Sequence, residues 1–144
     1  MDNKGRVNIP SRYREILQGR KDTQIVLTNL QQRLDKEASP NIRYILAFPY
    51  SEWQKVEDRL AEQPIFRNRN VQRFITSGVQ ECPLDRLGRI LIPSDLRDYA
   101  NLKREVCLVG MTRCFEIWDR AAYEAHAKQL VDTIDEGMLD ELLI

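Results

Sequence analysis

The stretch "DRLGRILIPSDLR" (residues 85–97) decides the fold, because the chain opens with almost the same phrase, "DNKGRVNIPSRYR" (residues 2–14). Seven of the thirteen aligned positions are identical. A repeated phrase of this kind usually marks a structural unit that occurs twice in one fold. We therefore expect two related halves.

The phrase itself predicts a turn, a strand and a short helix. Asp85 and Gly88 fit the first and fourth positions of a type I turn, where Asp accepts backbone N–H bonds and Gly tolerates a left-handed conformation. In the strand that follows, Ile90 and Ile92 face one side and Leu91 faces the other. The next residue, a proline, suits the first turn of a helix.

The repeat continues more faintly beyond the phrase. "QIVLT" (24–28) parallels "EVCLV" (105–109), and "RYILAFPYSEW" (43–53) parallels "RCFEIWDRAAY" (113–123). Each half is therefore predicted as phrase, strand, strand, helix. Before the second phrase, "FITSGVQECPL" (74–84) indicates a further strand, and Met1 stands directly before the first phrase. We expect the first half to lack this leading strand.

These patterns divide the chain into a first half at 1–62, a second half at 70–131 and an acidic, apolar tail at 132–144. The polar connection at about 29–42 is longer than its counterpart in the second half, and its composition predicts a flexible surface loop.

Two long helices are expected, one in each half. Ser51 is the candidate N-cap of the first and Asp119 of the second. Gly137 should interrupt the second helix. The tail that follows has apolar residues among acids, which predicts docking on its own protein or on a neighbouring subunit.

Composition excludes several classes of protein. The formal net charge is zero, but residues 1–20 carry +3 and residues 121–144 carry −5, a weak indication of an anionic partner. No apolar run approaches the ~20 residues of a membrane span, so we expect a soluble cytoplasmic protein. Cys82, Cys107 and Cys114 form no zinc motif with the single His and are expected to be buried, reduced thiols.

No catalytic motif is present, so we expect no enzyme activity, no cofactor, no metal and no small-molecule substrate. His126 is predicted to lie on a helix surface without a nucleophile beside it. Asp2 and Asp85 could act as an acid and base pair in principle. Their place inside the repeated turn instead favours hydrogen bonds to the backbone.

The basic residues of the turns leave two interpretations open. Arg6 and Arg89 each follow a turn glycine, with Lys4 and Arg86 inside the turns. A hairpin tip with fixed guanidinium groups can enter a DNA groove or contact phosphates. Alternatively, Asp and Arg form only an ion pair across the turn. The two interpretations are compatible, since the Asp can orient the Arg that contacts DNA.

Two copies of D-x-x-G-R-[VI]-x-I-P-x-x-[YL]-R, followed by "LVG" and "FEIWDRAAYEA", resemble the MraZ family of bacterial transcription regulators, in the AbrB/SpoVT group. The resemblance implies an α+β fold in which two pseudo-symmetric halves form an AbrB-like swapped-hairpin (double-split) β-barrel with peripheral helices. It also implies a homo-oligomeric ring, cytoplasmic and on the nucleoid, that binds double-stranded promoter repeats and regulates its own cluster of division and cell-wall genes.

The resemblance also assigns residues. Those implied in DNA binding are Arg6, Arg89, Lys4, Arg86 and Arg12, and those that orient the motif are Asp2, Gly5, Asp85 and Gly88. Arg14 and Arg97 also match, and we interpret them as structural residues near helix ends. An AbrB-type antitoxin and a structural ring without specific DNA binding remain as alternatives.

Overall fold

The computed structural model describes residues 1–64 and 69–143. In the first half these residues form β1 (Arg6–Asn8), α1 (Ser11–Gly19), β2 (Gln24–Thr28), α2 (Gln31–Leu34), β3 (Ile45–Pro49) and α3 (Tyr50–Ala61). In the second half they form α4 (Arg69–Ser77), β4 (Val79–Pro83), β5 (Arg89–Leu91), α5 (Ser94–Tyr99), β6 (Val106–Gly110), β7 (Phe115–Asp119), α6 (Arg120–Thr133) and α7 (Glu136–Leu143).

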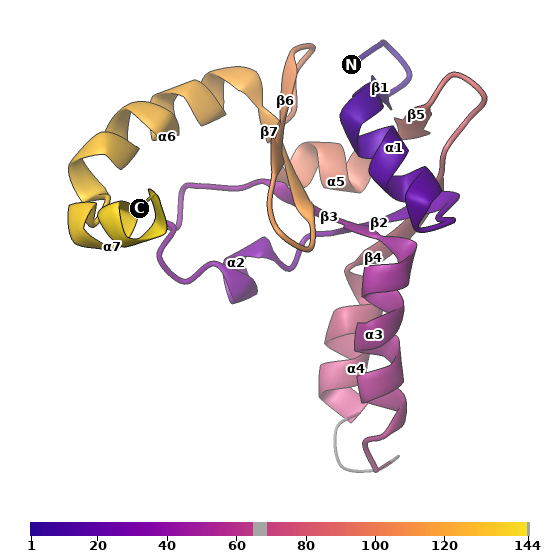
Figure 1. The fold of residues 1–144 in the computed structure, drawn as a ribbon. Helices are drawn as coiled ribbons and strands as arrows, with labels where there is room; N and C mark the ends of the chain where they lie inside the picture. The colour runs from indigo at the N-terminus through magenta and orange to yellow at the C-terminus, as the bar shows by residue number, and fades with distance from the viewer. Residues whose placement is uncertain (65–68, 144) are drawn as a thin grey trace.

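The strands form two antiparallel sheets in which the halves of the chain interleave (Figure 1). The smaller sheet pairs β1 with β5. The larger has the order β4-β2-β3-β7-β6, so that β4 of the second half lies against β2 of the first and β3 meets β7 at the centre. Each of the two sheets therefore combines strands from both halves.

The prediction of an α+β fold is confirmed by this mixture of helices and antiparallel strands. The described residues form two separate sheets and no closed barrel. The swapped-hairpin barrel therefore stays a prediction.

The larger sheet is nearly symmetric about its centre. β2 and β3 of the first half correspond to β6 and β7 of the second, and β4 covers the outer edge of β2. Within the described ranges no strand covers the corresponding edge of β6, which ends the sheet. Within the described residues, β4 therefore has no counterpart at the β6 edge of the sheet.

The main core lies between the two sheets and draws on both copies of the phrase. Ile90 and Ile92 are almost completely buried, whereas Leu91 between them is 55% exposed. Val7 and Ile9 are buried at the matching positions of the first copy. The predicted alternation is confirmed, and it places the same face of each phrase against one shared core.

The prediction of a strand at 74–84 is wrong over its first four residues. α4 continues to Ser77, and β4 begins only at Val79. The physical reason is the spacing of Val71, Phe74 and Ile75, three and four residues apart, which gives a helix an apolar side. Ile75 packs against the cluster of Val26, Leu30 and Trp53, and helix packing overrides the β-preference of the Ile-Thr pair.

The N-terminus of α3 is capped by a side chain from a different element. The helix begins at Tyr50, and Ser51 is not its N-cap as expected. Instead, the Ser51 backbone N–H and hydroxyl donate to the two carboxylate oxygens of Asp22, at 2.9 and 2.7 Å. Asp22 follows α1, so this contact fixes α3 to the loop that precedes β2.

The connection at 29–42 is not a simple surface loop, because Gln31 is fully buried in α2. Its side-chain amide donates to the Ile42 carbonyl and accepts from the Tyr44 N–H, both at 3.2 Å. The Tyr99 hydroxyl of the other half donates to the same Gln31 oxygen at 3.0 Å. One amide therefore ties both ends of this connection to α5.

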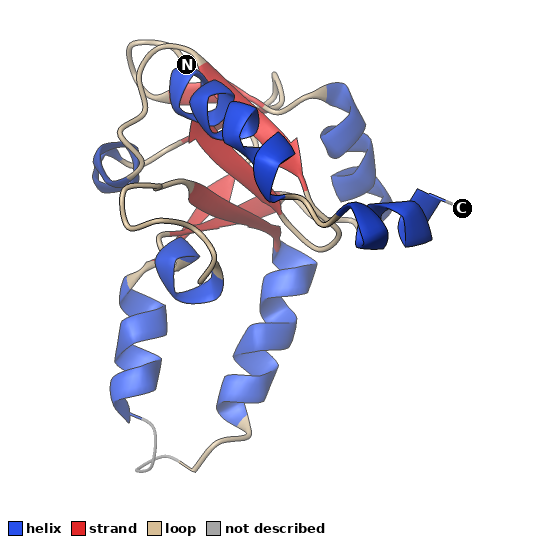
Figure 2. Ribbon diagram, turned by 90° about the vertical axis from the view of Figure 1, so that its left-hand side faces the viewer, coloured by secondary structure: helices blue, strands red, loops and turns tan. Residues whose placement is uncertain are grey.

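Two pairs of helices extend from the body in different directions (Figure 2). α3 and α4 leave the sheet on the side opposite to the N-terminus, and α6 and α7 form a separate arm. The predicted Asp119 cap of α6 is confirmed, since its carboxylate accepts from the Ala122 N–H at 3.3 Å. Gly137 does not break the helix as expected: the break is at Ile134, and the Asp135 carboxylate caps the start of α7.

The shared core gives a direct stability prediction. Ile92→Ala should lower the free energy of unfolding by about 2–5 kcal/mol, because it leaves a cavity where both sheets meet. Leu91→Ala, one residue away on the exposed face, should change it by less than about 0.5 kcal/mol. Urea unfolding of the two variants tests this, and equal losses would contradict the assigned faces.

Candidate nucleic-acid interface

The second copy of the phrase forms a tight turn organised by one carboxylate. The Gly88 N–H donates to the Asp85 carbonyl at 3.0 Å, and Gly88 has a φ of +76°. One Asp85 carboxylate oxygen accepts from the backbone N–H groups of Leu87 and Arg89, each at 2.9 Å. The other accepts from Arg89 Nε at 2.8 Å. The Asp85 carboxylate thus fixes the backbone of the turn and, through Nε, the orientation of the Arg89 guanidinium group.

The first copy repeats this arrangement contact by contact. Asp2 accepts from the N–H groups of Lys4 and Arg6, at 3.0 and 2.9 Å, and from Arg6 Nε at 2.6 Å. Gly5 has a φ of +89° and donates its N–H to the Asp2 carbonyl at 3.1 Å. The two turns, which we call tip 1 (residues 2–6) and tip 2 (residues 85–89), are therefore the same structure built twice.

The antiparallel pairing of β1 with β5 places the two tips at opposite ends of one short ladder. Asn8 lies opposite Arg89, and Arg6 lies opposite Leu91. The first residues of the two strands are therefore about 7 Å apart along the ladder, at a rise of ~3.3 Å per residue. Both tips lie on the side of the molecule opposite to α3 and α4 (Figure 1).

Each tip is covered by an arginine from the other half of the chain, a contact the sequence did not reveal. Arg14 of α1 lies against Gly88, and Arg97 of α5 lies against Gly5. A Cβ atom on Gly5 would stand 2.8 Å from Arg97 Cζ, and one on Gly88 would stand 2.5 Å from Arg14 Cδ. A methyl group at either position would therefore displace the arginine, and the positive φ angles would strain any residue other than glycine.

Arg14 lies in the first turn of α1, near the N-terminal end of that helix. Arg97 lies in the last turn of α5. The Nε atoms of both are buried without a hydrogen-bond partner in the described part of the chain. Each tip therefore has a second guanidinium group, packed against its turn glycine.

The remaining basic residues of the predicted set are exposed. Lys4 and Arg86 project from tips 1 and 2, and Arg12 lies on α1 with its guanidinium carbon 5.4 Å from the centre of the Tyr13 ring. None of the three forms an ion pair within residues 1–64 and 69–143. They add positive charge around the two tips.

The hydrogen bonds of the tips favour the charged form of each carboxyl group. The backbone N–H of Arg6, together with its guanidinium group, lowers the pKa of Asp2 to about 2. The backbone N–H and guanidinium group of Arg89 lower the pKa of Asp85 in the same way. Both carboxylates are therefore ionised at neutral pH.

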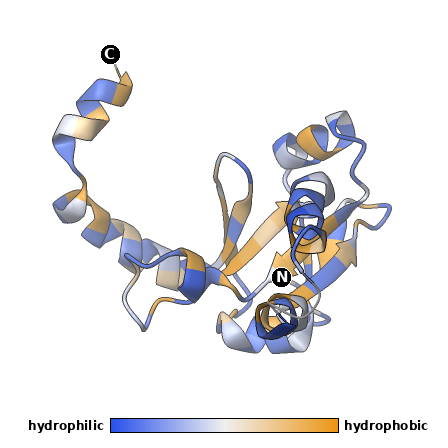
Figure 3. Cartoon of the chain, turned by 90° about the horizontal axis from the view of Figure 1, so that it is seen from below, coloured by the Kyte–Doolittle hydropathy of each residue, from blue (hydrophilic) through white to orange (hydrophobic). Residues whose placement is uncertain are grey.

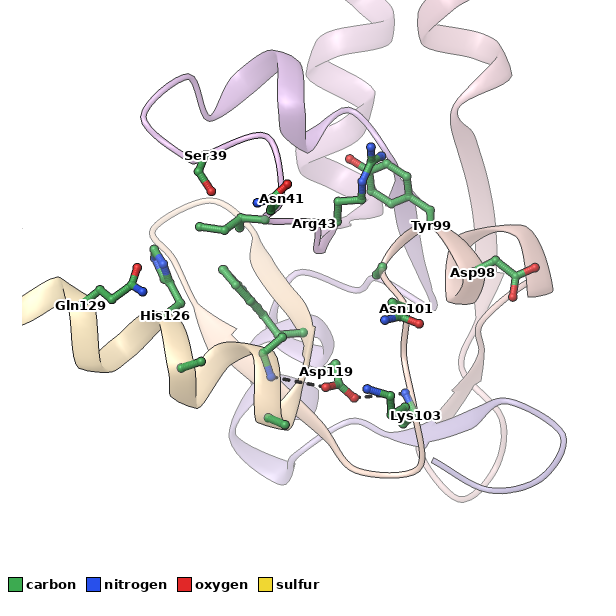
Figure 4. A pocket seen from close by; sticks show the side chains of 16 residues that line it. Ser39, Asn41, Arg43, Asp98, Tyr99, Asn101, Lys103, Asp119, His126 and Gln129 are labelled. Atoms are coloured by element: carbon green, nitrogen blue, oxygen red, sulfur yellow. Dashed lines mark hydrogen bonds between the residues drawn. The ribbon is translucent and has the colours of Figure 1, made fainter.

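A separate cavity of about 890 Å³ lies between α6, α5 and the 29–42 connection (Figure 4). His126 borders it and stacks on Trp118 with ring centres 5.2 Å apart, so it is half-buried rather than fully on the helix surface. Its Nδ1 atom has no hydrogen-bond partner among the described residues. The Asp119 carboxylate, which also borders the cavity, accepts hydrogen bonds from the backbone N–H groups of Lys103 and Ala122. The cavity therefore does not join an acid, a base and a nucleophile by hydrogen bonds.

The cysteines are free thiols, of which Cys82 is buried while Cys107 and Cys114 are half-buried. Burial raises the pKa of Cys82 to about 11, so this thiol stays protonated and unreactive at neutral pH. In the described ranges, no three side chains of the metal-binding types come together. None of the helices described there is long and apolar enough to cross a bilayer.

Comparison with known proteins agrees with the duplicated motif. A sequence model of a family described as "MraZ protein, putative antitoxin-like" matches residues 75–140. A protein of Syntrophobacter fumaroxidans named transcriptional regulator MraZ is 38% identical over 96% of this chain and 86% of its own length. The chain belongs to the MraZ family.

Other members of the MraZ family are similar over nearly the same extent. The transcriptional regulator MraZ of Shewanella sediminis is 40% identical over 93% of this chain and 84% of its own length. That of Pectobacterium atrosepticum is 36% identical over 92% and 82%. The similarity therefore extends over more than nine tenths of the chain in each case.

Gly88→Ala should destabilise the fold by more than about 1 kcal/mol, because the added methyl group meets Arg14 and the backbone has a positive φ. Gly19→Ala is the control, since nothing lies within 4 Å of a Cβ atom there. The control should be neutral or slightly stabilising in the same urea titration. A tolerated Gly88→Ala would contradict the packing of Arg14 on tip 2.

The Asp2 carboxyl group should titrate near pH 2 in the folded chain. Because this pKa is lower than that of the unfolded chain, tip 1 stabilises the fold above about pH 4, and the contribution is lost as pH falls towards 2. NMR titration of the Asp side-chain carboxyls measures the value. In the Arg6→Ala variant the pKa of Asp2 should rise only part of the way to 3.8, since the hydrogen bonds from the backbone N–H groups remain. An ordinary value in the unmodified chain would refute the hydrogen bonding described for tip 1.

Proposed function

We propose that this protein is a transcription regulator that binds double-stranded DNA through tips 1 and 2. The observation that carries the proposal is the duplicated tip, in which a carboxylate holds an arginine through the same contacts twice. The names of the relatives, transcriptional regulator MraZ, point to the same function.

The way each arginine is held supports contact with DNA. Arg6 and Arg89 use Nε to bind the carboxylate, which leaves the two terminal nitrogen atoms of each guanidinium group to donate elsewhere. A guanidinium group presents such donors in a rigid fork that matches two phosphate oxygens or the O6 and N7 atoms of guanine. The Asp therefore positions the arginine and does not consume its capacity to bind.

The spacing of the tips also suits a groove. A two-stranded ribbon fits the major groove of B-DNA, which is about 12 Å wide. The first residues of β1 and β5 are separated by about 7 Å along the ladder, so Arg6 and Arg89 can contact one stretch of DNA. In this proposal Lys4, Arg86 and Arg12 contact phosphates, and Arg14 and Arg97 keep the tips in place.

Neutral net charge makes binding by one subunit weak, because Asp2 and Asp85 offset part of the positive charge of the tips. Several subunits in a homo-oligomeric ring would raise affinity through effective concentration, provided that DNA repeats match the spacing of the tips. We accordingly propose that the ring binds promoter repeats on the nucleoid and represses its own cluster of division and cell-wall genes.

A second candidate function is an antitoxin of the AbrB type, which the family description and the exposed acidic arm of α6 and α7 favour. Such a protein would bind DNA with the same tips and a toxin with the arm. Co-purification of one stoichiometric partner that is lost on deletion of 132–144, without loss of DNA binding, would distinguish it.

Removing both arginines tests the DNA-binding proposal. In Arg6→Ala/Arg89→Ala, affinity for the upstream DNA of the gene should fall by about 1–3 kcal/mol per arginine if each contacts a base. Fluorescence anisotropy measures the affinity, and light scattering checks that the oligomer is unchanged. Arg59→Ala, on α3 away from the tips, is the control and should bind normally.

The salt dependence separates phosphate contacts from other effects. Lys4→Ala/Arg86→Ala should weaken binding to all sequences and reduce the slope of log affinity against log salt by about 2. Unchanged binding by the double arginine variant would show that the tips are not the DNA-binding surface, and no binding of the unmodified protein even at low salt would favour a structural ring without DNA binding.

A further inference from the structure

The arm formed by α6 and α7 exposes an acidic and apolar surface. Neither helix has a buried residue. Four apolar side chains of α7 are between 42% and 77% exposed: Met138, Leu139, Leu142 and Leu143. They form two adjacent pairs one turn of helix apart, so all four lie within a stripe on one side of α7. Residues 132–143 contain five acidic side chains and no basic one.

α4 exposes a surface of opposite charge. Phe74 and Val71 are 52% and 50% exposed, although the same helix packs Ile75 against the core. The Arg33 guanidinium carbon lies 6.0 Å from the centre of the Phe74 ring. α4 itself carries Arg69 and Arg73 and no acidic residue. The apolar side chains of α4 are therefore accompanied by positive charge.

The two surfaces are complementary in charge and in apolar character, and they lie at separate ends of the molecule. α7 ends an arm that extends away from the sheets, whereas α4 projects on another side (Figures 1 and 3). The two surfaces of one chain thus do not meet in this structure, whereas a second copy of the chain would offer each surface its complement.

We propose that α7 of one subunit docks on α4 of the next, so that Leu139, Leu142 and their neighbours cover Phe74 and Val71. The acidic residues beside the stripe then face Arg33, Arg69 and Arg73. Because the contact joins two different surfaces, it repeats in one direction and closes into a ring if the rotation per subunit allows. The inference rests on the homo-oligomer proposed above and identifies the surfaces that build it.

Two variants, each with one surface blocked, test the direction of the contact. Val71→Asp/Phe74→Asp blocks α4, and Leu139→Lys/Leu142→Lys blocks α7. All four side chains are exposed, so both variants should fold, and circular dichroism checks this. Met111→Asp is the matched control, because Met111 is 56% exposed between β6 and β7, outside both surfaces.

Size-exclusion chromatography with light scattering, without DNA, gives the decisive result. The unmodified protein and Met111→Asp should assemble, and each blocked variant alone should be a monomer. An equimolar mixture of the blocked variants should form a 1:1 dimer and nothing larger, since one intact α7 meets one intact α4.

Three results would overturn the proposal: a monomeric unmodified protein, a mixture that stays monomeric, or a blocked variant that still assembles. Assembly by the α4-blocked variant alone would indicate pairing of α7 with α7. The DNA-binding proposal is judged separately, because the monomeric variants keep both tips and should bind DNA weakly at low salt. A failure of assembly and a failure of DNA binding are thereby distinguished.

Discussion

The antiparallel pairing of β1 with β5 is the constraint on which the rest of the structure depends. It sets the two copies of the phrase side by side in opposite directions, and so places each tip beneath the helix of the other half. Arg97 reaches Gly5 and Arg14 reaches Gly88 only in this arrangement. The same pairing buries the apolar face of each phrase in one core. A change in register would therefore disturb the core and both tips together.

The ion pair within each tip orients the arginine side chain and contributes little to the stability of the fold. Pairs as exposed as Asp2 with Arg6 contribute little to stability in general, because water screens them. The carboxylate nevertheless accepts three hydrogen bonds, which fix the turn and the direction of the guanidinium group. A neutral protein can thus present an arginine in a defined position, and a second copy of the tip doubles the contact.

The sequence predicted those features that depend on neighbours along the chain. The turn at Asp85, the alternation of Ile90 with Leu91 and the cap at Asp119 all follow from local rules, and the structure contains them. The repeat alone predicts that tip 1 and tip 2 are equivalent, although their role in binding DNA stays a prediction.

Features that depend on tertiary contacts could not be predicted from the sequence. Nothing in the sequence shows that Arg14 packs against the glycine of tip 2, because the contact depends on the pairing of β1 with β5. The helical start of the 74–84 segment depends on packing of Ile75 against the core. The buried Gln31 stands in a polar stretch, and its partners are eleven or more residues away. In each case a distant residue supplies the deciding interaction.

The central claim is that the two tips together form the surface that contacts DNA. NMR mapping of the Arg Nε–H and backbone amide signals during addition of promoter DNA tests it most directly. The account predicts that the signals of Arg6, Arg89 and their turns shift most, and that those of α3 and α7 stay in place. Large shifts confined to other elements, with both tips unchanged, would contradict it.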